Sequence, residues 1–202
     1  MNRIKIVLLG EINTGKSCLV HYFIKGTFEQ SSVPTIGTAF TCKNLEKDNQ
    51  VLCLDLWDTA GAERFRSFSP LYYRDAKIIF LCYDITEKKT FEAIKNYWLK
   101  NIGKNCTEEV QIYIIGNKCD LEEYRTVEKQ EVENVIQENT EFQKMFFFET
   151  SSKEGNNIEK LLEHIFVNNV NVPQVIKENA IILKEPNNNG LLSYLNPYSY
   201  CS

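Results

Sequence analysis

The sequence lacks the features of several large protein classes. Its seven cysteines form no CxxC pair, so zinc binding and a disulfide framework are disfavoured, and we expect buried, reduced thiols in a cytoplasmic protein. No apolar run approaches the roughly 20 residues of a membrane span, and the start of the chain does not have the layout of a signal peptide. An excess of positive charge is also absent. The formal net charge of -4 argues against a nucleic-acid partner, because such binding depends on neutralising phosphates.

What the sequence does contain is an alternation of short β-rich runs and stretches of helical spacing. This pattern predicts a parallel sheet covered on both faces. Two alternating runs within 40–57 flank a polar stretch at 46–50, which predicts a hairpin and hence one antiparallel edge strand. The other expected strands are 5–9, 77–83, 111–116 and 145–150. Helices are expected at 16–25, from about Thr90 with Phe91, Ile94, Trp98 and Ile102 on one face, around Val127, Val132, Val135 and Ile136, and from about Asn157 to Val170.

The chain length and the change in composition after Val170 predict one domain and a tail. Residues 1–170 carry the periodic pattern, whereas 171–202 is rich in turn formers without sustained periodicity. We therefore expect a folded domain at 1–170 and a flexible tail at 171–202, in which a short helix around 175–183 is the one candidate element.

A phosphate-binding loop is predicted at residues 10–17, whose sequence GEINTGKS fits the pattern GxxxxGK(S/T) between a strand and a helix. Backbone N–H groups and the helix dipole can surround phosphate oxygens there, Lys16 can reach the β- and γ-phosphates, and the Ser17 hydroxyl can bind magnesium. A chance match in a turn is the alternative, which the flanking strand and helix disfavour. The expected contacts are Asn13, Thr14, Gly15, Lys16, Ser17 and Cys18.

A base-binding motif is predicted at Asn117, Lys118 and Asp120, after the strand at 111–116. An aspartate there can accept hydrogen bonds from guanine N1–H and the 2-amino group, whereas adenine would leave its carboxylate unpaired. Taken alone, NKxD is also common in turns. The run Ser151, Ser152 and Lys153 could supply an N–H to the guanine carbonyl and pack on the base or ribose, and its alternative is an ordinary helix start.

Three further residues complete the expected switch. Thr35 lies in a polar loop, where its hydroxyl could join Ser17 on magnesium, and Asp58 could hold the same ion through water. The N–H of Gly61 could contact the γ-phosphate, so that Lys16, Thr35 and Gly61 would act in hydrolysis. Because these contacts exist only while that phosphate is present, the loops would form a two-state element.

With these motifs assembled, residues 3–170 resemble a Ras-superfamily small GTPase of the Rab type. Rab-like signatures surround the nucleotide motifs at 36–40, 63–65, 71–76 and 83–86. The resemblance implies an α/β P-loop fold with a six-stranded, mostly parallel sheet, one antiparallel edge strand and five helices. It also implies GTP or GDP with Mg²⁺, exchange factors, effectors that recognise the GTP-bound loops, a GTPase-activating protein, and Phe28 packing against the guanine.

The chain departs from the family pattern in three places. Ala62 stands where relatives have the glutamine that aligns the attacking water, and a methyl group neither donates nor accepts a hydrogen bond. Ile12 stands where relatives have a small residue, so it could crowd the γ-phosphate and an inserted arginine. The tail ends with one cysteine, Cys201, at the penultimate position rather than in a CaaX box, and has no polybasic segment.

Two functions of different kinds remain open at this stage. The first is a Rab-like switch in vesicle trafficking that hydrolyses GTP slowly, is cytoplasmic, and reaches endomembranes only if Cys201 is prenylated. The second is a GTP-binding scaffold with little or no hydrolysis, which Ala62 and Ile12 favour. An alanine introduced to trap the GTP state is a third reading, and it would leave Ile12 unexplained.

Overall fold

The computed structural model describes residues 2–29, 34–62, 69–106 and 109–170. The expected tail at 171–202, with its short helix and Cys201, lies outside these ranges. None of the helices within them combines the length and the apolar composition that crossing a bilayer requires.

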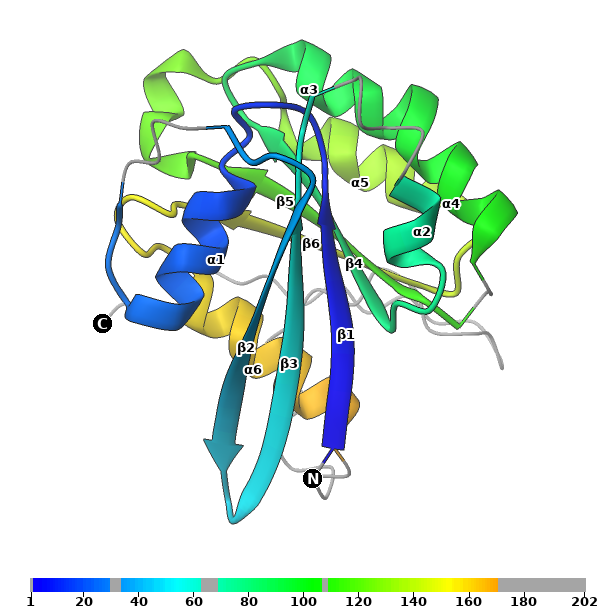
Figure 1. Ribbon diagram of the computed structural model, residues 1–202. Coiled ribbons are helices and arrows are strands. Elements are labelled where there is room, and N and C mark those ends of the chain that lie inside the picture. Colours follow the sequence, from blue (N-terminus) through cyan, green and yellow to red (C-terminus); the bar gives the residue numbers. More distant parts are fainter. Residues whose placement is uncertain (1, 30–33, 63–68, 107–108, 171–202) are drawn as a thin grey trace, which may run out of the picture.

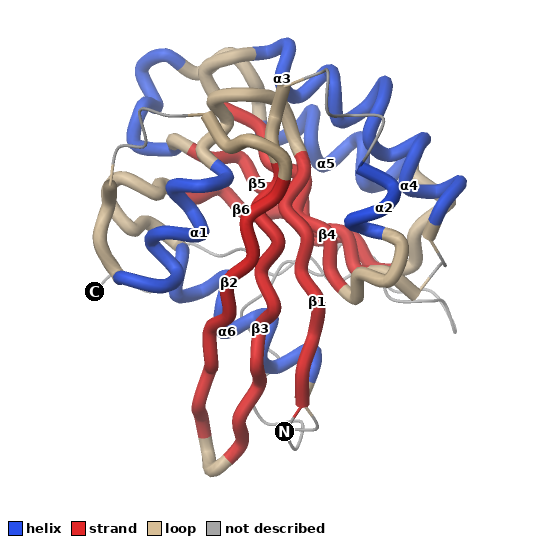
Figure 2. Tube along the Cα trace, viewed as in Figure 1, coloured by secondary structure: helices blue, strands red, loops and turns tan. Residues whose placement is uncertain are grey.

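One six-stranded sheet forms the centre of the molecule, with the strand order β2-β3-β1-β4-β5-β6 (Figure 2). Only β2 runs antiparallel to its neighbour, and it lies at the edge, as the hairpin pattern predicted. The strands are β1 Asn2–Leu9, β2 Thr38–Lys47, β3 Gln50–Thr59, β4 Ile78–Asp84, β5 Gln111–Asn117 and β6 Lys144–Thr150.

Helices cover both faces of this sheet, α1 and α6 on one face and α2 to α5 on the other (Figure 1). A π-helical turn, η2, joins α3 to α4, so that these three segments form one continuous helical run. Counted this way, the described residues contain the five helices that the resemblance implied, namely α1, α2, the α3–α4 run, α5 and α6. Their bounds are α1 Lys16–Lys25, α2 Ser69–Tyr73, α3 Lys88–Ala93, η2 Ile94–Trp98, α4 Leu99–Asn105, the 3-10 helix η3 Cys119–Tyr124, α5 Lys129–Glu138 and α6 Ile158–Asn169.

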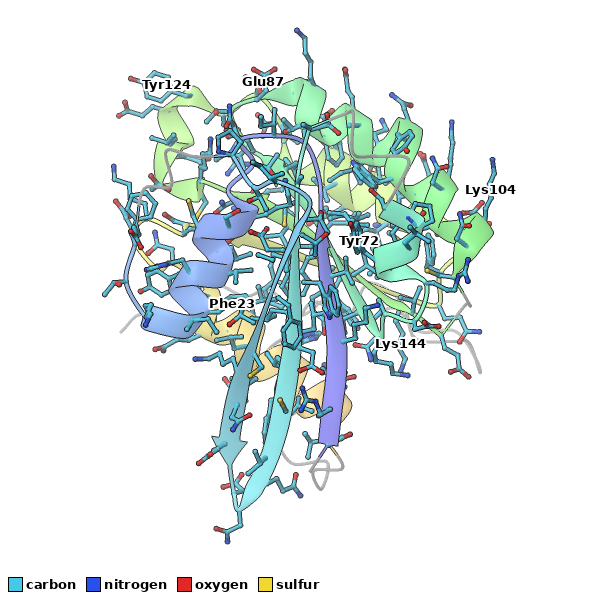
Figure 3. All side chains as sticks on the ribbon, in the orientation of Figure 1. Phe23, Tyr72, Glu87, Lys104, Tyr124 and Lys144 are labelled. Atoms are coloured by element: carbon cyan, nitrogen blue, oxygen red, sulfur yellow. The ribbon has the colours of Figure 1, made fainter. Side chains whose placement is uncertain are left out.

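The core has two layers because the central strands bury side chains on both faces. In β1, Ile6 and Leu8 face α1 and α6, whereas Val7 and Leu9 face the opposite helices, and all four are fully buried. Phe23 of α1 points toward the sheet (Figure 3) and meets the ring of Phe80 edge-on. Burial on both faces is what a near-continuous apolar strand predicts.

The β2–β3 hairpin turns through two residues, Asp48 and Asn49, between the paired Lys47 and Gln50. Both turn residues have positive φ, 50° and 61°, which matches the type I′ turn that suits the twist of an antiparallel pair. Asp and Asn tolerate this region better than most residues do. The polar stretch in the sequence therefore marked the turn correctly.

The third helix begins later than predicted. Val127 was expected on its apolar face, but α5 starts at Lys129, and Val127 lies before it with its N–H donating to the Ile85 carbonyl. Glu128 and Glu131 form a capping box that sets the start of the helix. Val127 is nevertheless fully buried. Its burial comes from a loop packed on the core, which helical periodicity alone does not distinguish from a helix face.

Candidate functional site

The predicted site residues meet at one edge of the sheet, where the parallel strands have their carboxyl ends (upper edge in Figure 1). The phosphate loop follows β1, Asp58 is near the end of β3, Asn117 ends β5, and Ser151 follows β6. Loops at this edge are the usual ligand sites of open α/β sheets, because consecutive loops converge there. Motifs more than a hundred residues apart in sequence are thus brought together.

The phosphate loop fits tightly against its surroundings, and two of its glycines are required by that fit. A Cβ at Gly10, which has φ 140°, would lie 2.2 Å from the Cys82 carbonyl oxygen, and one at Gly15, with φ 86°, would lie 2.2 Å from Asn117 Nδ2. Asn13 also has positive φ, 64°, on the exposed side of the loop. A residue with a Cβ at position 10 or 15 would clash with these atoms, so the loop could not keep its present backbone conformation.

Lys16 is held beneath this loop with its ammonium directed at loop carbonyls. Its Nζ donates to the Gly10 oxygen at 2.9 Å and to the Glu11 oxygen at 2.7 Å, and only 5% of the residue is exposed. Burial lowers the pKa of this ammonium because the charged form loses water. A nearby phosphate would supply the negative charge that a buried ammonium requires.

The N-terminus of α1 is open to an anion. The helix begins at Lys16, and neither a side-chain cap nor an acidic residue in the first turn occupies its end. The first N–H groups of a helix have no partner within the helix and attract anions. Ser17 and the half-buried Cys18 lie in this first turn, and Thr14 is fully buried just before it.

A group of oxygen atoms beside Ser17 suits a hard divalent cation. Ser17 Oγ lies 2.9 Å from Thr35 Oγ1, which lies 3.5 Å from Asp58 Oδ2. Within the described part of the chain, the buried Asp58 Oδ1 has no hydrogen-bond partner. Burial raises the pKa of Asp58, while hydrogen bonding from Ser17 and the charge of Lys16 act in the opposite direction. A cation here would satisfy the orphaned oxygen, so the residues fit Mg²⁺.

Ser17 and Asp58 also line a hollow of about 260 Å³ between α1 and β2. Across the described residues, no cluster of three or more His, Cys, Asp or Glu side chains is placed to hold a metal. Two hydroxyls and one carboxylate form an incomplete shell. Magnesium bound with few protein ligands takes the rest from phosphates and water, which matches this donor set.

At the base-binding end, Asn117 joins the phosphate loop to the loop after β6. Its Nδ2 donates to the Thr14 carbonyl at 2.9 Å, and its Oδ1 accepts from the backbone N–H and the hydroxyl of Ser152 at 3.2 and 3.1 Å. Asp120 accepts a 2.5 Å hydrogen bond from the Ser151 hydroxyl on one oxygen. The Asp120 carboxylate, which is predicted to bind guanine, is therefore held in place by Ser151 in the loop after β6.

The remaining base-site residues lie around this pair. Lys118 has φ 66°, and its Nζ forms a 2.5 Å ion pair with Asp84 at the end of β4. Sequence reasoning did not assign Asp84 to the site, although the run 83–86 was noted as a family signature. Phe28 is 39% exposed and Lys153 is exposed, so both side chains are accessible for packing on a base or ribose.

The residues after β3 place a glycine against the phosphate loop. A Cβ at Gly61 would lie 2.6 Å from the Glu11 carbonyl and from the Ile12 nitrogen, so the two backbones are in direct contact. The neighbouring Ala60 N–H donates to the Gly37 carbonyl at 2.8 Å. Ala62 follows and is half-buried, whereas Ile12 is 44% exposed at the loop surface. The family signature at 63–65 lies outside the described residues.

Comparison with known proteins gives a consistent result. The family model described as "Ras family" matches residues 5–171. "Ras-related protein Rab-30" of Homo sapiens is 40% identical over 181 residues, which is 84% of this chain and 87% of the relative. "Ras-related protein Rab-13" of Rattus norvegicus is 38% identical and "Ras-related protein Rab-10" of Diplobatis ommata 41% identical, each over 156 residues; these alignments cover 77% of this chain and 74% and 76% of the relatives.

Proposed function

The chain belongs to the Ras family as a Rab-like small GTPase that binds GTP or GDP with Mg²⁺, and we propose that it is a trafficking switch with slow GTP hydrolysis. The observation that carries the proposal is Ala62, which directly follows the glycine in contact with the phosphate loop. A methyl group cannot orient the attacking water, a task that a glutamine performs in Ras.

The other residues of the site can still bind and polarise a triphosphate. The Lys16 ammonium lies beneath the phosphate loop and the start of α1 has no side-chain cap, so both could balance charge that develops on a bound phosphate during cleavage. Thr35 and Ser17 can hold Mg²⁺, which when bound neutralises phosphate charge. Because these groups serve binding as much as cleavage, their presence does not replace the missing amide.

We propose that the bound nucleotide controls the Thr35 and Gly61 segments. Thr35 connects to Asp58 and Ser17 through hydroxyl contacts, and Gly61 lies on the loop that would hold the phosphates. Loss of the γ-phosphate would remove a shared partner of both segments. Exchange factors, effectors and a GTPase-activating protein are the partners this switch would require, and Ile12 would hinder an inserted arginine.

A GTP-binding scaffold with little or no hydrolysis is the second candidate, favoured by the combination of Ala62 and Ile12. The two candidates differ in whether the protein itself converts bound GTP to GDP. In both cases we propose that residues 1–170 form the GTPase domain and that 171–202 is a tail. Prenylation of Cys201, detectable by mass spectrometry, would place this cytoplasmic protein on endomembranes.

The test is single-turnover hydrolysis of bound GTP with Mg²⁺ by the parent and by Ala62→Gln. Intrinsic hydrolysis in Ras proceeds at about 3–5 × 10⁻⁴ s⁻¹, and we expect the parent to be slower by about tenfold or more, equal to about 1.4 kcal/mol of lost transition-state stabilisation. Ala62→Gln should restore the rate, whereas Ala62→Leu, with similar bulk and no amide, should not.

Each outcome separates the candidates. If the parent hydrolyses GTP slowly and Ala62→Gln restores the rate, the result supports a switch that returns slowly to its GDP-bound state. No measurable hydrolysis in either protein, with GTP still bound, supports the scaffold. A parent as fast as Ras would contradict both, because another group would then have to orient the water.

A further inference from the structure

Glu11 makes a side-chain contact that nucleotide binding does not account for. Its backbone carbonyl accepts from Lys16 Nζ at 2.7 Å and from the Thr14 hydroxyl at 3.0 Å, as part of the phosphate loop. Its carboxylate is directed elsewhere: Oε1 lies 3.4 Å from the indole Nε1 of Trp98, 87 positions away in sequence. The loop is therefore connected by its second residue to the helical run α3–α4.

Trp98 is placed for this contact by an unusual segment of that run. Figure 3 labels Glu87, which precedes the run, and Lys104, which lies near its end. Trp98 is the last residue of the π-helical turn η2 and is 2% exposed. Wide turns of this kind are rare and occur frequently at functional sites. A buried indole N–H requires an acceptor, and the Glu11 carboxylate provides one at this position.

The backbone that Glu11 anchors is in contact with two parts of the site at once. Lys16 holds its carbonyl, and Gly61 lies so close that a Cβ there would be 2.6 Å from the carbonyl carbon and oxygen of Glu11. A displacement of Glu11 would therefore change the acceptor of the buried ammonium and the surface against which Gly61 lies. The phosphate loop is also closely packed at its start, where a Cβ at Gly10 would lie 2.2 Å from the Cys82 carbonyl oxygen, so a shift of Glu11 cannot be taken up there.

We infer that Trp98 is a positioning residue for nucleotide retention: its indole N–H, through the Glu11 carboxylate, holds the phosphate loop in its binding shape. The 3.4 Å separation exceeds the usual 2.7–3.2 Å range of N–H···O hydrogen bonds. The contact is therefore a long hydrogen bond, and we expect its loss to have a modest effect on nucleotide release. The inference rests on nucleotide binding by this site and not on the slow hydrolysis proposed above.

The first test measures release of a fluorescent GDP analogue in the presence of Mg²⁺. Trp98→Phe keeps an aromatic ring but removes the N–H, and we expect release roughly three- to tenfold faster, as for loss of one hydrogen bond of ordinary strength. Glu11→Ala should have a similar effect, and Glu11→Gln, which keeps an acceptor oxygen, a smaller one. The double variant Trp98→Phe/Glu11→Ala should release no faster than the single variants, because both remove the same contact.

The second test follows the indole signal itself in nitrogen–proton NMR spectra. The chain has two tryptophans, so Trp57→Phe leaves one signal and assigns it to Trp98. Glu11→Ala should shift this signal with the fold otherwise intact, and Glu11→Gln should shift it less. Because Trp57 packs on Phe40, release is also measured for Trp57→Phe alone, and the effects of the Trp98 and Glu11 changes are compared with that rate.

The outcomes distinguish this inference from the proposed function. Unchanged release in Trp98→Phe or Glu11→Ala, or additive effects in the double variant, would overturn the inference. If Trp98→Phe does not fold, Glu11→Ala decides the matter, since its side chain is only half-buried. A parent that retains no nucleotide would instead contradict the proposed function.

Discussion

We propose that base selection depends on the charge and hydrogen-bond pattern of Asp120. The Ser151 hydroxyl fixes one carboxylate oxygen at 2.5 Å, so the side chain is held in place before a base arrives. A carboxylate only accepts hydrogen bonds, whereas an amide of the same shape also donates. Changing this one group should therefore change which purine is preferred without moving the loop.

We predict that Asp120→Asn lowers the preference for GTP over xanthosine triphosphate by roughly 10² or more, because the guanine N1–H and amino group lose their acceptor. Xanthine presents a carbonyl where guanine has the amino group, and the new amide can donate to it. Competition for the bound fluorescent nucleotide measures both affinities. Asp48→Asn, at the hairpin turn, is the matched control. An unaltered purine preference would remove Asp120 from base recognition.

At this scale the sequence predicted the residues of the candidate site but not their partners. The phosphate loop, Asp58, Asn117 and Asp120 could be recognised because their backbone or hydrogen-bonding requirements fix residue types at fixed spacing. The ion pair between Lys118 and Asp84 could not. Asp84 ends β4 and Lys118 directly follows β5, so their approach depends on the pairing of β4 with β5 in the sheet.

Among the elements, the connection between η3 and β6 depends on one nearly buried ion pair. The Arg125 guanidinium donates to Glu149 at 2.6 and 3.0 Å, to Glu122 at 2.7 Å, and to the Val127 carbonyl at 2.9 Å. The side chains of Arg125 and Glu149 are 7% and 9% exposed. Hydrogen bonding from Arg125 also lowers the pKa of Glu122. The pair holds the loop after Asp120 close to the strand that leads to Ser151.

We predict that Arg125→Ala lowers the free energy of unfolding by about 3 kcal/mol, because the Glu149 carboxylate stays buried without its main partner. Lys129, 3.3 Å from Glu149, compensates in part. The control is Lys47→Ala, which breaks the exposed pair with Glu163 and should lower the free energy of unfolding far less, because solvent screens that pair. Urea unfolding of both variants measures the difference. Equal losses would show that burial does not strengthen the Arg125 pair.

Element boundaries could be predicted where local chemistry sets them. Helix α1 has the expected bounds, since Gly15 and Gly26 flank it in the left-handed conformation. The π turn η2 was not foreseen, because Ile94, Trp98 and Ile102 remain on one buried face and the periodic pattern hides the wider turn. The prediction for Val127 was wrong for a related reason. Val127 is buried, as its apolar side chain indicated, but it lies in the loop before α5 and not in the helix.

For the whole molecule, one core layer contains a buried titratable ring. The layer under α1 and α6 includes the buried His164, whose ring lies edge-on to Tyr113, Phe146 and Phe148. Its Nδ1 is 3.1 Å from the Tyr113 hydroxyl, and its Nε2 is 3.1 Å from Asn168 Nδ2. Since an amide nitrogen only donates, this arrangement assigns the neutral imidazole, with Nε2 as acceptor.

This histidine should make the stability of the entire domain depend on pH. Burial lowers the pKa of His164 from 6.5 to about 4 in the folded protein. The unfolded chain therefore binds a proton at higher pH than the folded chain does. The stabilisation is complete above pH 6.5 and is lost as the pH falls toward 4, because protons then favour the unfolded state. A shift of this size corresponds to at most about 3 kcal/mol.

We predict that the free energy of unfolding of the parent falls more steeply between pH 6.5 and 4 than that of His164→Gln, which has no imidazole to protonate. The variant should be less stable than the parent at pH 7, because it loses ring packing, and the gap should narrow as the pH falls. Urea unfolding at a series of pH values measures both curves. His21→Gln removes the other histidine and should keep the steep slope of the parent. Parallel curves for the parent and His164→Gln would mean that His164 takes up its proton equally in the folded and unfolded chains, and the buried neutral ring would then have no part in acid sensitivity.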